Sequence, residues 1–285
     1  MAETFSLRLR DGTVRAFPRP TLMGILNATP DSFFDGDPQQ NKALLLARLD
    51  RMVHEGVALV DLGGESTRPG ATPVPLLTEL DRVIPLLRHA RKEYPGLLIS
   101  IDTTKAAVAD AALQEGADLI NDTSAGEDSE GLLFESCARA GCPLILMHRN
   151  GRPDSMQDNP VYGDVVAEVC AALAGRARLA QAAGIRRDRI VLDPGIGFGK
   201  LEAHNLALLR GLPALKALGY PVLVGASMKR VVGDLTGRPT AERLPGTLGL
   251  HLAASLLGAD LLRLHEPWAM KDALIAFRAL IPQEV

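Results

Sequence analysis

The chain has 285 residues, a formal net charge of −3, 47% hydrophobic residues and 23% charged residues. This balance is ordinary for a globular protein with a large apolar core, and it excludes the basic surface on which nucleic-acid binding depends. The three cysteines have no C-x-x-C spacing, which argues against both a disulfide framework and a zinc knuckle.

The chain begins with a pattern typical of a β-hairpin. In LRLRDGTVRAF (7–17), apolar and polar residues alternate around Asp11 and Gly12, a dipeptide that favours a two-residue type I′ turn. We therefore expect residues 1–20 to form a small ribbon ahead of the main fold. Because the start has no apolar signal segment and no apolar run is long enough to span a membrane, we expect the protein in the cytoplasm.

Eight short apolar runs follow, and each ends in a polar residue that could bind a ligand. They are rich in Ile, Leu and Val, as are strands buried on both faces of a parallel sheet. The runs span residues 21–27, 59–64, 98–103, 119–124, 143–148, 190–195, 221–227 and 261–266.

Helical periodicity follows each run, at residues 40–56, 76–92, 105–116, 128–141, 161–184, 203–219, 241–258 and 268–280. Six glycines stand where a helix should end, a position that favours left-handed backbone: Gly56, Gly116, Gly141, Gly184, Gly219 and Gly258. This alternation predicts an α/β fold, a (β/α)8 TIM barrel over residues 21–285. With the short N-terminal hairpin it would form a single domain of residues 1–285.

The carboxyl ends of the strands meet at one mouth of such a barrel, where its active site lies. Asp102 and Asp193 would lie there, and a buried carboxylate is costly unless a group donates to it. A planar heterocycle with adjacent N–H and NH2 groups would satisfy them, while Asn121 reads the ring edge and Lys229 donates to it. The alternative is that each acid pairs with a nearby Lys or Arg and only stabilises the barrel.

A second group of residues suits an anion. Arg263 and His265 alternate along the last strand, so both face the same side, at the usual phosphate position of this fold. Asn27, on the neighbouring first strand, offers a carbonyl oxygen to Mg²⁺, an ion usually held by few protein ligands and by substrate phosphates. The long polar loops 28–40 and 65–75 would lie on the same rim, where they could order over a substrate.

The glycine-rich segment 195–200 matches neither the dinucleotide-binding pattern nor the P-loop pattern. We instead expect a close approach of its backbone to a flat ligand, with Phe198 as one wall. His148, at the end of a strand, has no predicted role.

Eight segments resemble dihydropteroate synthases, in the expected order and across the whole barrel. The two most specific are MGILNATPDSFFDG (23–36) and VDLGGESTRPGA (60–71). The others are ISIDTTK (99–105), INDTSAG (120–126), LMHRNGRPDSMQ (146–157), LDPGIGFGK (192–200), GASMKR (225–230) and LRLHE (262–266). The resemblance implies a folate-pathway transferase that joins 6-hydroxymethyl-7,8-dihydropterin pyrophosphate to 4-aminobenzoate and releases pyrophosphate. It also implies competition by sulfonamides and a homodimer.

The resemblance further implies three sets of site residues. The pterin would be bound by Asp102, Asn121, Asp193 and Lys229. The diphosphate and Mg²⁺ would be held by Asn27, Thr67, Arg68, Arg263 and His265. The aminobenzoate site would be bordered by Phe198, Pro69, Ser227 and Lys229.

These charges favour a dissociative substitution. Departure of diphosphate leaves positive charge on the pterin, which Asp102 would stabilise while Mg²⁺ and basic side chains stabilise the leaving group. By resemblance, Asp35 helps to enclose the cation. We therefore expect Asp102, Lys229, Asp35 and Arg68 to be catalytic. We expect no essential general base, because the aryl amine is already neutral near pH 7.

Two segments depart from the family pattern. Met228 stands where an arginine is usual, and Arg149 and Asn150 stand where a methionine and a glutamine are usual. Arg230, next to Lys229, is a candidate for the missing positive charge.

Three other functions stay open from the sequence. The pterin-binding methyltransferase domain of corrinoid systems would share Asp102, Asn121 and Asp193 but would need no diphosphate-binding rim. A Schiff-base aldolase could use Lys229 if its basicity were lowered. A non-catalytic pterin carrier would bind the ring and release no pyrophosphate.

Overall fold

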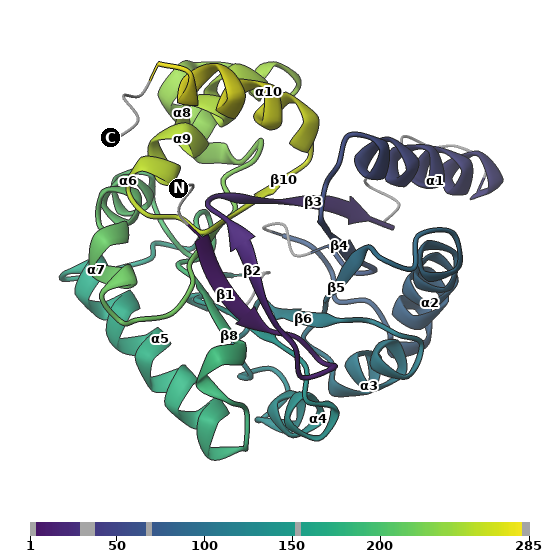
Figure 1. The fold of residues 1–285 in the computed structure, drawn as a ribbon. Coiled ribbons are helices and arrows are strands. Elements are labelled where there is room, and N and C mark those ends of the chain that lie inside the picture. The colour runs from purple at the N-terminus through teal and green to yellow at the C-terminus, as the bar shows by residue number, and fades with distance from the viewer. Residues whose placement is uncertain (1–3, 29–37, 67–69, 152–154, 281–285) are drawn as a thin grey trace.

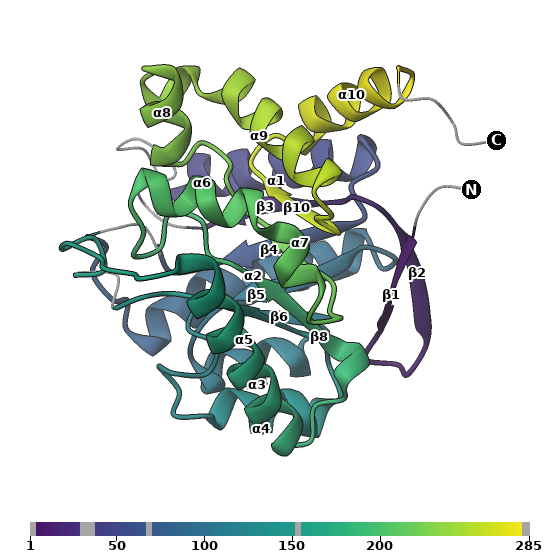
Figure 2. The same cartoon turned by 90° about the vertical axis from the view of Figure 1, so that its left-hand side faces the viewer.

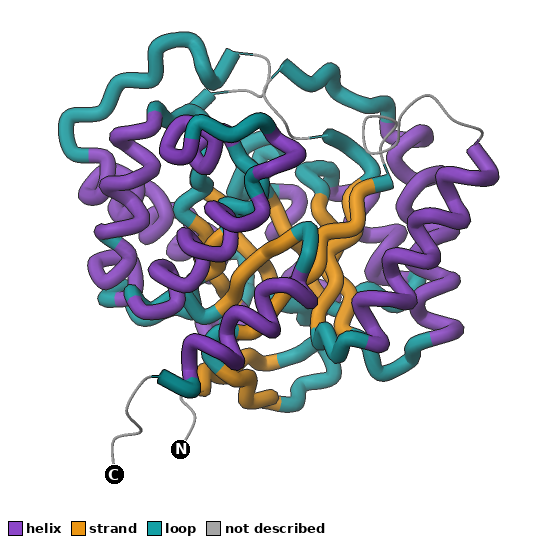
Figure 3. The backbone as a smooth tube through the Cα atoms, turned by 90° about the horizontal axis from the view of Figure 1, so that it is seen from above, coloured by secondary structure: helices purple, strands orange, loops and turns teal. Residues whose placement is uncertain are grey.

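The computed structural model describes residues 4–28, 38–66, 70–151 and 155–280. Within them, eight parallel strands form a barrel with helices outside (Figures 1 and 3). The strands are β3 (Thr21–Asn27), β4 (Leu59–Gly63), β5 (Leu98–Asp102), β6 (Leu119–Asp122), β7 (Leu144–Met147), β8 (Ile190–Asp193), β9 (Leu223–Val224) and β10 (Leu261–Leu264). The predicted TIM barrel is therefore confirmed.

The barrel is closed by regular strand pairing everywhere except between β8 and β9. Strands β3 to β8 pair in chain order, and β10 pairs with β3 on one side and with β9 on the other. β9 has only two residues, and its side of the barrel meets β8 at one isolated bridge, between Leu192 and Val222. The segment after β9 therefore receives little support from neighbouring strands.

The predicted hairpin is present, but its turn differs from the prediction. Its strands are β1 (Thr4–Arg8) and β2 (Val14–Pro18). The carbonyl of Leu9 accepts from the Gly12 N–H at 3.1 Å, and the Leu9 N–H donates to Thr13 at 2.8 Å. Gly12 has φ of +87°, whereas Asp11 is not left-handed and its carboxylate accepts from the Thr13 N–H at 2.9 Å. A type I′ turn needs two left-handed residues, so the chain forms a three-residue loop instead.

The hairpin lies across one end of the barrel (Figure 2). Phe5 and Phe17 stack with their ring centroids 5.3 Å apart. The hairpin residues Phe5, Leu7, Leu9 and Phe17 form a buried cluster with one residue of every barrel strand: Met23, Leu59, Leu98, Leu119, Ile145, Val191, Leu223 and Leu261. Because these residues precede the strand ends, the hairpin closes the amino end and leaves the carboxyl mouth for a site.

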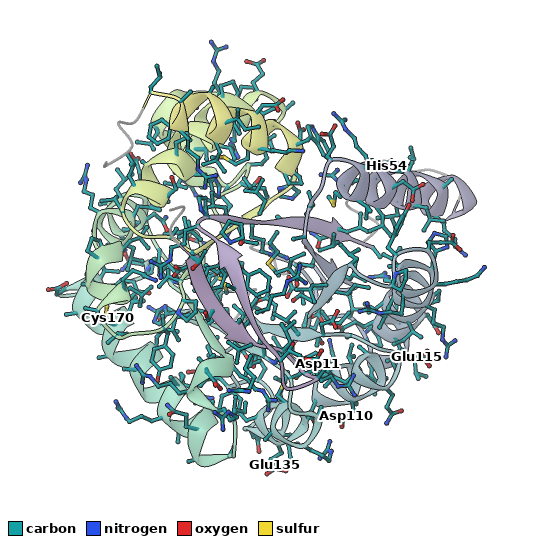
Figure 4. All side chains as sticks on the ribbon, in the orientation of Figure 1. Asp11, His54, Asp110, Glu115, Glu135 and Cys170 are labelled. Carbon is teal, nitrogen blue, oxygen red and sulfur yellow. The ribbon has the colours of Figure 1, made fainter. Side chains whose placement is uncertain are left out.

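Helices pack around the barrel and bury a continuous apolar layer against it. They are α1 (Pro38–His54), α2 (Leu76–Glu93), α3 (Ala106–Gln114), α4 (Leu132–Ala140), α5 (Val165–Ala182), α6 (Glu202–Arg210), α7 (Leu212–Lys216), α8 (Arg230–Thr236), α9 (Leu244–Leu256) and α10 (Pro267–Arg278). Charged side chains such as Glu115 and Glu135 lie on the outer rim of this layer (Figure 4). Among the described helices, none has the length and apolar character needed to cross a membrane.

Two helical predictions need correction. Residues 203–219 form two helices, α6 and α7, because Pro213 has no N–H to continue the helical bonding and follows Gly211 closely. Residues 230–236 form α8, where the sequence predicted only a connection. By contrast, all six glycines predicted at helix ends have positive φ, between 64° and 102°.

Candidate active site

Four side chains form the floor of the carboxyl mouth: Asp61 of β4, Asp102 of β5, Asn121 of β6 and Arg263 of β10. The strand register places Asp102 between Gly63 and Asn121. Residues on either side of them, including Leu62, Ile101, Ile120 and Leu262, belong to the apolar layer under the helices. Alternation along the strands therefore turns the polar side chains into the barrel.

A hydrogen-bonded network joins these floor residues. The guanidinium of Arg263 donates through Nε to Asp61 at 2.6 Å and through Nη2 to Asp102 at 2.7 Å. Asn121 donates through Nδ2 to the same Asp61 oxygen at 3.0 Å. The second oxygen of each carboxylate and the Asn121 Oδ1 are buried and accept no hydrogen bond from the described residues. Since unsatisfied buried acceptors are costly, the floor suits a ligand that brings several donors.

Burial dominates the charge state of Asp102. It raises the pKa of this carboxyl to about 7, against the opposing effect of the Arg263 charge. The nearby acids Asp61, Glu79 and Asp122 raise it further. Asp102 can therefore change its charge near neutral pH, as groups at functional sites often do.

Asp193 and Lys229 are two further charged residues of the mouth, and each changes the pKa of the other. Burial raises the pKa of Asp193, while Lys229, a hydrogen bond from the Gly195 N–H at 2.7 Å and the Arg263 charge lower it. Burial lowers the pKa of Lys229 to about 8, and Asp193 opposes this. Lys229 and Arg263 both lower the pKa of Asp193, so these groups lie close enough to influence one another. Arg263 also pairs with both acids of the floor, and such pairing of acids with basic side chains is the alternative that the sequence left open.

Ser227 and His265 meet next to Lys229, at the ends of β9 and β10. The Ser227 Oγ accepts from the His265 backbone N–H at 3.1 Å and lies 3.0 Å from the ring Nδ1. This contact links the segment after β9 to the end of β10, next to Arg263. The two predicted anion-binding residues, Arg263 and His265, are thus neighbours, although Arg263 is already paired with acids of the floor.

Phe198, predicted as one wall of a ligand site, lies in a small apolar cluster at the end of β8. It packs with Met147 and Met156, and the Lys229 ammonium lies 4.3 Å from its ring centroid. The Lys229 Nζ also donates to the Ile196 carbonyl at 2.6 Å. The Phe198 ring and the Lys229 cation therefore lie side by side at the end of β8.

Glycine is required around Phe198 for a different reason from the one the sequence indicated. A Cβ on Gly195 would lie 1.9 Å from the His148 carbonyl oxygen, and one on Gly199 would lie 2.2 Å from that of Asn150. Both residues also have positive φ. These glycines permit close approach of another backbone segment of the protein, rather than of a ligand.

His148 and Lys200 form a buried pair whose role the sequence did not predict. The Lys200 Nζ lies 3.0 Å from the His148 Nδ1 and donates to the Phe198 carbonyl at 2.9 Å. Burial lowers the pKa of His148 to about 3 and that of Lys200 to about 7. The imidazole is therefore neutral and accepts from the lysine, which fixes the loop that carries Phe198.

The two departures from the family pattern have different surroundings. Arg149 is 5% exposed at its side chain, pairs with Asp128 at 2.6 Å, and lines a small cavity together with Asp102. Met228 contacts α9 through its sulfur, which lies 3.7 Å from the Thr247 hydroxyl. The Arg230 side chain is 85% exposed and lies 3.5 Å from Asp234, so it contributes no charge to the buried floor.

A magnesium ion fits the residues at the mouth only if substrate oxygens complete its coordination. Among the described residues, no cluster of three His, Cys, Asp or Glu side chains could hold a metal. The Asn27 Oδ1, at the end of β3, lies where a Cβ on Gly63 would come within 2.9 Å of it, so glycine leaves this oxygen room. One hard oxygen ligand agrees with the few protein ligands that Mg²⁺ usually takes beside phosphates.

Four predicted site residues, Asp35, Thr67, Arg68 and Pro69, lie outside the described residues. Asp61 is a site residue without a predicted role, and it accepts from both Arg263 and Asn121. Its position, two residues before Gly63 on the inward side of β4, is the signal that points to the floor.

The barrel belongs to the class of pterin-binding enzymes, because the family described as pterin binding enzyme matches residues 23–265. A dihydropteroate synthase from Synechocystis sp. is 44% identical over 253 residues, which cover 88% of this chain and 87% of that protein. The Xanthomonas albilineans dihydropteroate synthase structure with 4-aminobenzoic acid is 43% identical, with a TM-score of 0.89 over 98% of this chain and 100% of that chain. Another structure from that organism, in complex with 7,8-dihydropteroate, is 40% identical, with a TM-score of 0.86 over 98% and 100% of the two chains. This chain therefore belongs to the dihydropteroate synthase family.

Proposed function

We propose that this protein synthesises 7,8-dihydropteroate. The amino nitrogen of 4-aminobenzoate forms a bond to the methylene carbon of 6-hydroxymethyl-7,8-dihydropterin pyrophosphate, the C–O bond to diphosphate breaks, and the amine proton goes to solvent. One observation carries the proposal: the buried oxygens of Asp102, Asn121 and Asp61 lack donors among the described residues. A pterin edge, with adjacent N–H and NH2 groups, supplies donors in that arrangement.

The charges of the mouth support a dissociative reaction. The Asp102 carboxylate, in its ionised form, stabilises positive charge that develops on the pterin when diphosphate leaves. Lys229 donates to the ring and limits the approach of water together with the Phe198 wall. No described residue is needed as a general base, because the attacking aryl amine carries a lone pair near pH 7.

Arg263 and His265 hold the diphosphate in this proposal. A guanidinium has five N–H donors, and Arg263 uses two of them on Asp61 and Asp102, so three are left for phosphate oxygens. The acids on its other side keep Arg263 fixed, which preorganises its charge for the leaving group. His265 extends the same donor surface beyond the end of β10.

The metal ion and the remaining site residues are further parts of the proposal. Asn27 would hold Mg²⁺ together with diphosphate oxygens and water, and the ion would neutralise charge on the leaving group. From the family resemblance, Thr67 and Arg68 join the diphosphate site, Pro69 borders the aminobenzoate site and Asp35 encloses the cation. The resemblance also supports a homodimer in the cytoplasm, and sedimentation of the purified protein tests the dimer.

One assay separates this function from the alternatives. The protein is incubated with dihydropterin pyrophosphate and Mg²⁺, and released pyrophosphate and dihydropteroate are measured with and without 4-aminobenzoate. We expect both products in equal amounts only with 4-aminobenzoate, and neither after chelation of the metal. A pterin carrier would bind the ring and release no pyrophosphate. Trapping of a carbonyl substrate on Lys229 by borohydride would indicate an aldolase instead.

A further inference from the structure

The segment after β9 carries two site residues, Ser227 and Lys229, on a weakly supported part of the barrel. β9 is two residues long, and its pairing with β10 ends at Val224. Residues 225–229 must therefore satisfy their buried backbone groups elsewhere. Their partners determine where Ser227 and Lys229 lie.

Helix α9 supplies those partners through side chains one helical turn apart. The Ala226 N–H donates to the His251 Nε2 at 3.3 Å, and the Met228 N–H donates to the Thr247 Oγ1 at 3.0 Å. The Thr247 hydroxyl lies 3.7 Å from the Met228 sulfur, to which it donates. Arg243 completes the set, because its Nη1 donates to the Met228 carbonyl at 3.1 Å.

The partners of His251 determine its tautomer. Its Nδ1 lies 2.8 Å from the Thr247 carbonyl oxygen, which can only accept, so Nδ1 carries a proton. Its Nε2 lies 3.3 Å from the Ala226 N–H, which can only donate and favours a lone pair there. Burial lowers the pKa of His251 to about 4, so the ring is neutral at pH 7, although the Val224 carbonyl also acts on the ring and raises its pKa. Both His251 and Thr247 are 0% exposed.

Met228 requires this support because its backbone is strained. Its φ is +59°, a left-handed conformation that a methionine rarely adopts. Ser227 and Lys229, on either side of it, reach His265 and the Ile196 carbonyl at the mouth. The strained residue therefore turns toward α9 while its two neighbours face the site.

We propose that His251 and Thr247 are positioning residues that hold segment 225–229 so that Ser227 and Lys229 meet the substrates. His251 acts through its backbone contacts, which are the Ala226 amide, the Thr247 carbonyl and the Val224 carbonyl. The inference deepens the proposed function and rests on it for its kinetic consequence, whereas the geometry of the histidine can be tested without any substrate.

Three variants of His251 test the proposal in the full chain. His251→Gln places an amide oxygen near the Nε2 position and can keep the bond from Ala226, whereas His251→Asn reaches only the Nδ1 position. We expect His251→Asn and His251→Ala to lower kcat/KM for 4-aminobenzoate by about tenfold, the effect of leaving one buried amide unpaired. His251→Gln should recover most of that loss.

Leu173→Ala is the matched control for lost stability, because Leu173 is fully buried in α5 and contacts none of these groups. It should lower the midpoint of urea unfolding while both KM values stay unchanged. Equal kinetics for folded His251→Ala and wild type, or no difference between the Gln and Asn variants, would overturn the positioning role.

Nuclear magnetic resonance of the wild-type protein gives a result that does not depend on turnover. With ¹⁵N-labelled histidine at pH 7, we expect a proton on the His251 Nδ1 and none on Nε2, and slow hydrogen exchange at the Ala226 amide. A proton on Nε2, or a charged ring, would overturn the inference even if every variant failed to fold. If wild type made no dihydropteroate but showed this tautomer, only the proposed function would fail.

Discussion

Substitution of Asp102 by Asn tests the electrostatics of the floor most directly. The amide keeps the shape of the carboxylate but carries no charge, and Arg263 keeps its bond to Asp61 at 2.6 Å. Burial raises the pKa of Asp102 from 3.8 to about 7. Between these values the folded protein binds a proton that the unfolded chain has lost. The contribution to stability is therefore complete below pH 3.8 and is lost as the pH rises through about 7.

The size of this effect follows from the pKa change. At about 1.36 kcal/mol per pKa unit, the two units between pH 5 and pH 7 make the wild type about 3 kcal/mol less stable at the higher pH through this group alone. An Asn side chain does not titrate, so the Asp102→Asn variant should lack this part of the pH dependence. Urea unfolding of both proteins at pH 5 and pH 8 measures the difference.

Turnover of the same variant tests the catalytic role. Loss of one preorganised charge should lower kcat by about 10²–10³. Asp260→Asn is the matched control, because Asp260 is also a buried acid but lies just before β10, at the amino end of the barrel, where it pairs with Arg19 at 2.6 Å and accepts from the Val222 N–H at 2.7 Å. It should lose stability and keep its turnover per folded molecule. Full turnover of Asp102→Asn, or a pH dependence of unfolding equal to that of wild type, would refute the reasoning.

Three other predictions concern the mouth, a loop and the amino end of the barrel, which the hairpin closes. The pH profile of kcat/KM should rise toward pH 7 as Asp102 ionises. It should fall above pH 8 as Lys229 loses its proton, because burial lowers the pKa of Lys229 to about 8. A flat profile from pH 6 to 9 would contradict both assignments. Gly195→Ala should prevent folding, because its Cβ would lie 1.9 Å from a carbonyl oxygen, whereas Gly12→Ala, with nothing within 4 Å, should cost about 1 kcal/mol in urea unfolding. Phe17→Ala should lower the unfolding free energy by about 3–5 kcal/mol and leave the KM values of the folded protein unchanged.

Strand ends were predictable from the sequence because their signal is local. An apolar run followed by Asp102, Asn121 or Asp193 shows both the strand and the polar group at its end. The partners of those groups are set by the closure of the barrel and leave no local signal. Arg263 meets Asp61 across 202 positions of sequence, so the sequence could offer pairing of the acids with a Lys or Arg only as an alternative, and the structure shows which residues pair.

The missed helix boundaries had other causes. Residues 203–219 keep an apolar periodicity through Gly211 and Pro213, and that periodicity outweighed the two helix breakers in the prediction. The support of segment 225–229 by α9 could not be predicted either. It depends on β9 being only two residues long, and the apolar run 221–227 indicated a longer strand.

Alternation along the strands separates the residues that stabilise this barrel from the residues that form its site. In β4, Leu59 joins the cluster under the hairpin and Asp61, two residues later, faces the mouth. In β10, Leu261 and Arg263 repeat the arrangement, as do the pairs Leu119 with Asn121 and Val191 with Asp193. Since alternate residues face the same side, these four strands present an apolar side chain inward at the end closed by the hairpin and a polar one at the open end. The apolar cluster under the hairpin therefore holds the strands in a fixed register. This fixed register keeps the buried, incompletely satisfied charges of the mouth in place for a substrate.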